Sequence, residues 1–197
     1  MQSLLKDIAQ VASGFSFRGA LPIKERGSIR VVQAKNIDPE MEISEASPLT
    51  RVDAAGIGDT LHLREGDVLL ATRSVGSGDF KANSCGELKG DVIASSSVCI
   101  IRLNDERVLP AYLAIYLNSA IGQEALSHYA SGAAVQLLLL RNIREIEIPI
   151  PPLEVQRDLI DLLRNTRTQK RLLERQKELL RYIDRHVMNT VIESNTL

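Results

Sequence analysis

Residues 143–163 read IREIEIPIPPLEVQRDLIDLL, and this stretch decides the fold because two patterns meet inside it. Residues 143–150 alternate apolar and polar side chains with period two, as a half-buried strand does. Pro152 then suits the first turn of a helix, and nothing from residue 153 to about residue 192 would end one. The chain is therefore predicted to change from a strand-bearing part to one long helix near Pro152.

The predicted helix is long and carries a single apolar face. About forty residues at a rise of ~1.5 Å each would span roughly 60 Å. The apolar side chains recur at a period of about 3.5 to 3.6 residues, which is typical of a coiled-coil seam. We take the following residues as the candidate helix–helix interface: Leu159, Leu162, Leu163, Leu172, Leu173, Gln176, Leu179, Leu180, Ile183 and Val187.

An apolar face of this length needs a partner helix, either in a hairpin within the chain or in a second chain. No second helix of matching length is predicted here, so the pattern favours an intermolecular coiled coil. Thr166, Gln169 and Gln176 lie on or near the seam. Polar residues there would lower the stability of the pair and can fix its register.

Residues 1–150 hold all twelve glycines and several short apolar runs. The pattern predicts strands over residues 29–35, 67–72, 96–103 and 143–150. It predicts helices over residues 3–11 and 109–129, the second with breaks at Ser119 or Gly122. We therefore expect an α+β fold, with a twisted β-sheet and short helices followed by one long C-terminal helix.

The charge of the chain is balanced. Lys and Arg number 24 against 25 Asp and Glu, a net charge of -1. A dedicated non-specific nucleic-acid binder is usually strongly basic, so any DNA contact here must depend on where individual charges lie. Residues 1–150 carry a balance of -3 and residues 151–197 one of +2, so neither part is a basic arm.

No targeting or membrane segment is predicted. Residues 1–15 lack the basic and apolar regions of a secretory signal, and no run reaches 18 apolar residues. Cys85 and Cys99 do not form a disulfide framework. We therefore expect a soluble cytoplasmic protein with reduced thiols and no membrane partner.

Signals of catalysis are weak. The chain has no Gly-x-x-x-x-Gly-Lys-Ser/Thr loop and no Cys-x-x-Cys pair, and its three histidines lack ligand spacing, so we expect no metal and no cofactor. Glu87 and Lys89, with Asp79 upstream, match half of a metal-dependent nuclease site, a match common by chance. The glycines of SVGSG, residues 74–78, form only a weak phosphate-binding pattern.

Four segments, in this order and spacing, carry a resemblance to one family. They are LLKDIAQVASGFSFRG (4–19), LREGDVLLATRSVGSG (63–78), VLPAYLAIYLNSAIGQEAL (108–126) and GAAVQLLLLRNIREIEIPIPPLEVQRDLIDLL (132–163). The last is the most specific, because its Ile-Pro-x-Pro-Pro-Leu-x-x-Gln pattern is typical of the start of the family's conserved helix. The chain resembles the specificity (S) subunit of type I restriction–modification enzymes.

The resemblance implies a DNA target recognition domain over residues 1–150 and a conserved helix over residues 151–197. A full family member has two such units, whose helices form an antiparallel coiled coil, so this chain resembles a half-size form that would homodimerise. The family's S subunit is non-catalytic. It recognises double-stranded DNA and docks the modification (methyltransferase) subunits, and through them a restriction subunit.

Base recognition needs side chains that can reach base edges, and phosphate contacts need cations. Loops and strand ends of residues 1–150 supply both kinds, and Arg73 and Lys81 are the first choices. The candidate DNA-binding residues are Ser16, Arg18, Lys24, Arg26, Arg30, Gln33, Lys35, Asn36, Arg73, Ser74, Ser77, Lys81, Gln136 and Arg141.

Two further interpretations stay open at this point. One is an S-subunit-like regulatory module that binds the modification subunit through its helix without reading DNA. The other is an autonomous nuclease, which rests on Glu87 and Lys89 alone. If the family interpretation holds, the near-zero net charge predicts that the isolated chain binds DNA weakly and in a salt-sensitive way.

Overall fold

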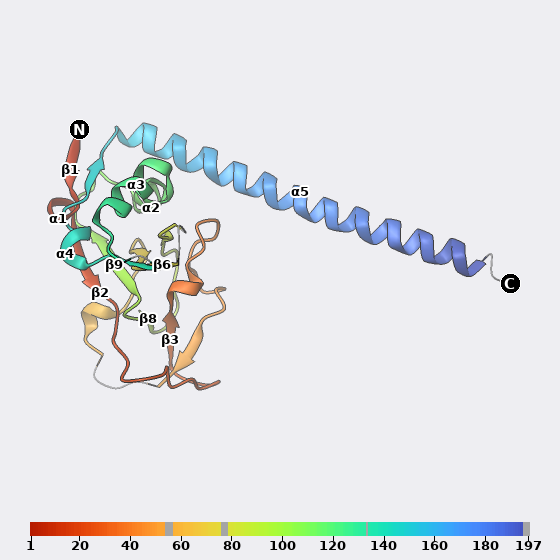
Figure 1. Cartoon of the computed structure of the whole chain (residues 1–197), viewed down its shortest axis with the longest axis horizontal. Helices are drawn as coiled ribbons and strands as arrows, with labels where there is room; N and C mark the ends of the chain where they lie inside the picture. Colours follow the sequence, from red (N-terminus) through yellow and green to blue (C-terminus); the bar gives the residue numbers. More distant parts are fainter. Residues whose placement is uncertain (54–56, 76–78, 133, 195–197) are drawn as a thin grey trace. The chain divides into compact units, whose positions relative to one another are not determined.

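The computed structural model describes residues 1–53, 57–75, 79–132 and 134–194. The chain divides into two compact units, Met1–Arg157 and Asp158–Leu197. The first unit, which we call the globular unit, holds the strands and the short helices (Figure 1). Helix α5 (Leu153–Ser194) begins at the end of the globular unit and continues through the second.

A four-stranded antiparallel sheet forms the centre of the globular unit. Its order is β2-β9-β5-β7, with β2 over Ala9–Ser13, β9 over Val98–Leu103, β5 over Val68–Ala71 and β7 over Ala82–Ser84. All four residues of β5 are buried, as are the first four of β9. Valine and isoleucine are enriched in strands, so these runs suit a sheet that is covered on both faces.

A second sheet of three strands has the order β4-β3-β8. Strand β3 (Ile29–Val32) is antiparallel to β4 (Thr50–Val52) and parallel to β8 (Val92–Ala94). Beneath it, a cluster of Ile29, Val31, Val52 and Ile93 is joined by Phe15, Phe17, Leu21 and Ile57. The loop of residues 14–28 therefore contributes to this smaller core.

Two short ribbons complete the strands. Strand β1 (Gln2–Leu4) pairs with β11 (Glu147–Pro149), and β6 (Arg73–Val75) pairs with β10 (Val135–Leu137), both antiparallel. Each ribbon joins segments that lie far apart in the sequence. The second ribbon carries several of the candidate DNA-binding residues.

The helix predicted over residues 109–129 is two helices, α2 (Pro110–Asn118) and α3 (Ala120–Tyr129), with the predicted break at Ser119. The Ser119 hydroxyl accepts a hydrogen bond from the Gly122 amide at 3.1 Å and caps α3. A Cβ on Gly122 would lie 2.0 Å from the Tyr116 carbonyl oxygen. Only glycine therefore lets α3 start this close to the last turn of α2.

The prediction of a helix over residues 3–11 is wrong. Only Leu5–Ile8 forms a helical turn, α1, and Ala9–Ser13 is strand β2. The apolar spacing also suits a turn followed by a strand, and pairing with all but the first residue of β9 decides between the two. The strand predicted over residues 143–150 is shorter than expected, because α4 (Leu140–Ile143) occupies its start.

Two short 3-10 helices, η1 (Ala34–Asn36) and η2 (Asp59–Leu61), lie in the connections of the globular unit. The α+β class is confirmed, and so is the long helix predicted from residue 153. Along α5 the side chains of residues 171–187 are all exposed, and Leu162 and Leu173 are 62% and 63% exposed. The coiled coil itself stays a prediction.

Candidate nucleic-acid interface

The β6–β10 ribbon brings together candidate residues that lie far apart in the sequence. Its register places Arg73 opposite Leu137 and Ser74 opposite Gln136. The Leu138 amide donates to the Thr72 carbonyl at 2.9 Å and extends the ladder by one bond. Arg73 is exposed and makes no hydrogen bond or ion pair with the part of the chain that the structure describes.

The other polar residues of the ribbon differ in exposure. Gln136 is half-buried, whereas Ser74 is 5% exposed and has an interaction of its own. Arg141, in α4 shortly after β10, is exposed. Arg73 and Arg141 are thus the cations of this region that are open to a ligand, and Ser74 faces inward.

Lys81 lies where β5 ends and β7 begins. Its carbonyl accepts a hydrogen bond from the Ala71 amide at 2.8 Å, which places it across from Ala71, two residues before Arg73. Phe80 and Ala82 on either side are fully buried, while the Lys81 side chain is exposed. The two first-choice residues therefore share one rim of the sheet. Ser77, with Gly76 and Gly78, lies outside the described residues.

The candidates of the first loop lie along the smaller sheet. Bridges from Phe15 to Ser95 and from Ile23 to Val52 attach the loop of residues 14–28 to it. Ser16, Arg18, Lys24 and Arg26 are all exposed. Lys24 is paired with Asp53, its Nζ lying 2.8 Å from Oδ2, and this hydrogen bond raises the pKa of Lys24.

Three candidates of the smaller sheet already have hydrogen-bond partners within the protein, and of these Arg30 is buried while Gln33 and Asn36 are half-buried. Arg30 is 7% exposed, and its guanidinium donates to the backbone carbonyls of Glu45 at 2.9 Å and Lys89 at 2.5 Å. Gln33 and Asn36 form a reciprocal cap at η1, and the Gln33 amide also donates to Thr50. These three side chains hold loops together, and their contact with DNA stays a prediction. Lys35 beside them is exposed.

Arg51 is an exposed cation that the sequence analysis missed. It lies on β4 opposite Arg30, and its guanidinium donates to the Gly27 carbonyl at 3.2 Å. A lone arginine in a weak strand pattern carries no local signal. Its place beside the exposed first loop emerges only from the pairing of β4 with β3.

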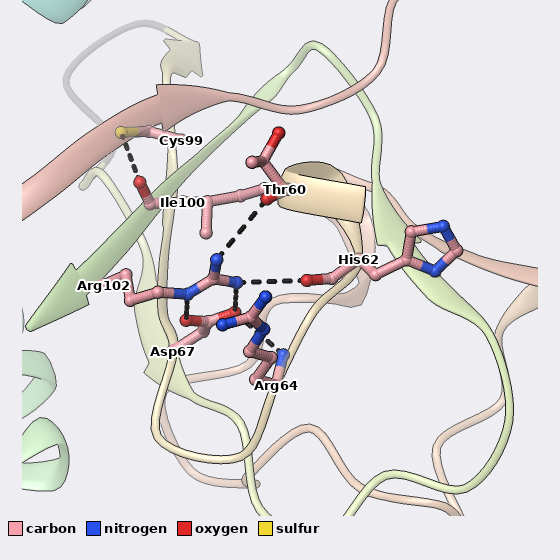
Figure 2. A network of polar contacts seen from close by, with 7 residues as sticks. All are labelled: Thr60, His62, Arg64, Asp67, Cys99, Ile100 and Arg102. Atoms are coloured by element: carbon pink, nitrogen blue, oxygen red, sulfur yellow. Dashed lines mark hydrogen bonds and ion pairs between the residues drawn. The ribbon is translucent and has the colours of Figure 1, made fainter. Parts of the chain in front are cut away.

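A buried ion pair fixes the loop before β5. Figure 2 shows Arg102 of β9 with two nitrogens on the Asp67 carboxylate, Nε and Nη2 each 2.7 Å from an oxygen. The same guanidinium donates to the His62 carbonyl at 3.0 Å, and the Arg64 amide donates to Asp67 at 2.8 Å. Asp67 is 1% exposed, and its hydrogen bond raises the pKa of Arg102. This pair thus binds the segment around η2 to the central sheet.

Polar side chains of α2 and α3 hold two strand edges. Three tyrosine hydroxyls donate to carbonyls of alternate residues around β11: Tyr129 to Glu145 at 3.4 Å, Tyr116 to Glu147 at 3.2 Å and Tyr112 to Pro149 at 2.7 Å. Asn118 and Gln123 bond to the backbone around β7. The sequence of this segment predicts its helices but carries no signal of these bonds.

The first turn of α5 is attached to the globular unit by one buried amide. Gln156 is fully buried; its Oε1 accepts from the Leu109 amide at 2.9 Å, and its Nε2 donates to the carbonyls of Arg107 at 2.7 Å and Pro151 at 2.8 Å. All these partners lie within the globular unit. The glutamine of the Pro-Pro-Leu-x-x-Gln pattern therefore has a structural role.

The nuclease interpretation gains no support from the geometry. Lys89 pairs with Glu45, Nζ to Oε2 at 2.8 Å, and not with Glu87. Over the described part of the chain, no three His, Cys, Asp or Glu side chains gather in a way that could hold a metal ion. Cys85 and Cys99 are buried free thiols. No described helix is both long and apolar enough to cross a membrane.

Comparisons with known proteins agree with this architecture. No curated protein matches the chain. Several solved chains share its fold, among them the following three. A chain from work on complex assembly and conformational transition of the type I R-M system is 19% identical, with a TM-score of 0.64. The HsdS subunit from Thermoanaerobacter tengcongensis is also 19% identical, with a TM-score of 0.58. The type IIG restriction endonuclease BpuSI is 11% identical, with a TM-score of 0.59.

The matches cover most of this chain but less than half of each solved one. The shares are 89% and 40% for the first, 86% and 37% for the HsdS subunit, and 83% and 26% for BpuSI. The model of the type I restriction modification DNA specificity domain matches residues 1–182, which include the whole globular unit and most of α5. The chain therefore belongs to the type I restriction modification DNA specificity domain family.

Proposed function

We propose that this chain is the non-catalytic DNA-recognition component of a type I restriction–modification system. The globular unit reads one part of a bipartite DNA target, and α5 docks the modification subunits and, through them, a restriction subunit. The family match over residues 1–182 carries the proposal, because it spans both the unit that would read DNA and most of the helix that would dock. The reaction itself would belong to the partner subunits, so this chain needs no cofactor.

The exposed cations at the rim of the central sheet support DNA reading. Arg73 has its five donors available, and an arginine can pair with guanine through two of them. Lys81 and Arg141 can neutralise phosphates, and Gln136 can pair with adenine. We therefore take Arg73 as the main base contact and Lys81 as the main phosphate contact. Ser16, Arg18, Lys24, Arg26, Lys35 and Ser77 stay as secondary candidates.

The exposed apolar face of α5 supports pairing with a second copy of the chain. Its residues fit consecutive heptads, in which Leu159, Thr166, Leu173, Leu180 and Val187 take the a positions and Leu162, Gln169, Gln176 and Ile183 the d positions. A twofold pair would present two identical recognition units and would suit an interrupted palindrome.

An antiparallel pair has one register that matches the sequence best. With the twofold axis level with Arg171, Leu159 meets Ile183 of the second copy, Leu162 meets Leu180, and Thr166 meets Gln176. If one helix is shifted along the other by one heptad, Leu180 meets Gln169 of the second copy. A shift the other way sets Leu159 against Gln176 and leaves Ile183 opposite Pro152, before α5 begins. The first register also sets Gln169 against Leu173 next to the axis, but it alone keeps Leu159, Leu162, Leu180 and Ile183 all in apolar layers, which favours it.

The antiparallel pair can be tested by cysteine cross-linking, since Cys85 and Cys99 are buried and do not compete. We expect a mixture of the Leu159→Cys and Ile183→Cys variants to form a mixed disulfide dimer and neither variant alone to form one. Self-cross-linking of each single variant would instead demonstrate a parallel pair.

DNA reading can be tested with the chain assembled with its modification subunits. Arg73→Ala should reduce discrimination between target and mismatched duplexes by ~1–3 kcal/mol, roughly tenfold to a hundredfold, in competition gel shifts. Arg107→Ala, which removes a cation paired with Asp105, serves as the control. Lys81→Ala should weaken binding to all sequences and lower its salt dependence.

An assembled complex that neither binds nor methylates any duplex would contradict the proposal. Assembly without DNA binding would favour the regulatory interpretation. Comparing the methylation motifs of a host with and without the gene would give the target sequence as well. The isolated chain should bind the same duplex much more weakly than the complex, because its net charge is only -1.

A further inference from the structure

The segment that leads into strand β7 is paired on its outer edge by side chains at Phe80 and Ala82, whereas the carbonyl of Ser84 at the end of the strand accepts a hydrogen bond from the Ile43 amide. Gln123 accepts from the Phe80 amide through Oε1 and donates to the Phe80 carbonyl through Nε2, both at 2.8 Å. Asn118 does the same for Ala82, accepting at 3.0 Å and donating at 2.8 Å. Each carboxamide thus binds one backbone residue at both of its polar groups, as a neighbouring strand would.

Both carboxamides are themselves fixed by a third hydrogen bond. Asn118 Nδ2 donates to the Ala114 carbonyl at 2.7 Å, and Gln123 Nε2 donates to the Leu117 carbonyl at 2.5 Å. Both carboxamides are therefore also held by α2, whose Ala114 and Leu117 carbonyls accept these bonds. A leucine at either position would fill the space but leave a backbone N–H and C=O without partners.

Residues 80 and 82 flank Lys81, which the proposed function makes a phosphate contact. The Lys81 carbonyl bonds to Ala71 on β5, so the inner edge of this segment is held by the sheet and its outer edge by the two carboxamides. Phe80 and Ala82 are fully buried between these supports, and the Lys81 side chain is exposed. The direction in which Lys81 leaves the surface is thus set from both sides.

We propose that Asn118 and Gln123 are positioning residues for DNA recognition, acting by holding the backbone on both sides of Lys81. This rests on the proposed function, because it assumes that Lys81 meets DNA. It goes beyond that function by assigning a role to two residues of α2 and α3 that do not contact DNA themselves. Their contribution to DNA binding then passes entirely through Lys81.

The test uses the full chain in complex with its modification subunits and compares Asn118→Leu, Gln123→Leu and their double variant with the parent. Tyr116→Phe is the matched control, because it removes a hydrogen bond from α2 to β11 instead of β7. Hydrogen exchange of the free chain reports on the amides of Phe80 and Ala82. Competition gel shifts report on DNA affinity, with and without Lys81→Ala in the same chain.

We expect exchange at Phe80 and Ala82 to quicken by at least ~10-fold in the double variant, since each amide loses its acceptor. DNA affinity should fall about as far as in Lys81→Ala, and Lys81→Ala should add less than about twofold in the double-variant background. Tyr116→Phe should change neither. If the leucine variants fail to fold, Asn118→Asp and Gln123→Glu keep the acceptor and remove the donor, and a smaller effect of the same kind is expected.

Unchanged exchange at Phe80 and Ala82 would overturn the clamp itself. Faster exchange with full DNA affinity, while Lys81→Ala weakens binding, would overturn the positioning role and leave the proposed function intact. If Lys81→Ala has no effect on binding, the positioning role fails with it. The effect of Arg73→Ala then decides separately whether the globular unit reads DNA.

Discussion

The globular unit and α5 differ in how far their side chains are buried and paired within the chain. In the globular unit most large apolar residues are buried, although Ile23 and Ile121 are each 70% exposed, and no described buried polar side-chain atom lacks a hydrogen-bond partner. Along α5 the leucines of the apolar face are exposed except for the half-buried Leu163, with Leu172 and Leu173 at 63%. One part of the chain is complete by itself, whereas the other has a surface that costs free energy until a partner covers it.

The difference between these two regions distinguishes a surface suited to assembly from a surface suited to a charged ligand. An exposed apolar stripe on a helix of 42 residues needs a partner of similar length, so it is evidence for assembly. An exposed cation without a partner among the described residues is available to a charged ligand, and the proposed DNA contacts require such availability. Arg73 and Lys81 are cations of this kind. Substitutions in one region should therefore leave the other region unaffected.

The largest effect is expected from charge on the apolar face of α5. Leu173→Glu with Leu180→Glu removes four buried leucines from a twofold pair, at about 1.5–3 kcal/mol each. The dimer should weaken by at least ~6 kcal/mol, roughly four powers of ten in the dissociation constant. Sedimentation velocity measures this, and thermal unfolding of the globular unit should not change.

A matched pair of charge changes controls this experiment. Arg164→Glu with Arg171→Glu alters two positions one heptad apart on the opposite face of α5. These should leave self-association within about threefold of the parent. A parent chain that sediments as a monomer at tens of micromolar would refute self-pairing outright.

The second effect concerns the buried ion pair of the globular unit. Asp67→Ala leaves the Arg102 guanidinium without its carboxylate and the Arg64 amide without an acceptor. We expect the free energy of unfolding to fall by about 3 kcal/mol, because one partner of a buried pair has been removed. Urea unfolding measures this. Asp53→Ala, which breaks the exposed pair with Lys24, should change stability little.

Self-association of the Asp67→Ala variant should be unchanged at temperatures where the globular unit stays folded. A loss of dimer together with stability would mean that the globular unit contributes to the dimer interface. That result would contradict the separation of the two regions.

A third, smaller effect locates the boundary between the regions. Gln156→Leu removes the three hydrogen bonds that hold the first turn of α5 to the globular unit. Leaving buried backbone groups unpaired should cost about 2 kcal/mol of the unfolding free energy. Glu154→Leu, on the same turn but exposed, is the control. An unfolding free energy equal to the parent's would show that the turn is held by other contacts.

The elements that the sequence predicted correctly carry their own local signals. Helix α5 has an uninterrupted pattern after Pro152, and the break between α2 and α3 has a capping serine at Ser119. Strands β5 and β9 are short apolar runs bounded by turns. Each can be found without knowing what packs against it, which is why the fold class and the long helix could be predicted.

The errors occur where a distant segment decides. Strand β2 exists because Ala9–Ser13 pairs with β9, and the local spacing also suited a helix. Arg30 looks like a free cation in the sequence, but backbone carbonyls from two other loops bind its guanidinium. The sequence could not assign a role to Asn118 and Gln123. Both bind backbone groups around β7, and backbone groups leave no signal in the sequence. Contacts between segments far apart in the sequence decide these cases, and they become visible only in the three-dimensional structure.

The smallest effect is a pH dependence of the globular unit alone. Burial raises the pKa of the Cys99 thiol to about 12, whereas an unfolded thiol ionises near ~8.5. The unfolded state therefore loses its proton first, and the stabilisation, complete below ~8.5, is lost as the pH rises toward 12. Between pH 8 and 9 this thiol should lower the unfolding free energy by ~0.7 kcal/mol.

Cys99→Ala should remove that part of the slope, and Ile100→Val, a change at the neighbouring buried position, should retain it. Equal slopes for the parent and Cys99→Ala, measured by urea unfolding at each pH, would mean that the thiol ionises in the folded state as it does in the unfolded one. Because both variants change only the core of the globular unit, the dimer dissociation constant should be the same for both throughout the pH range. The pH dependence thus probes the enclosed core of one region without touching the exposed face of the other.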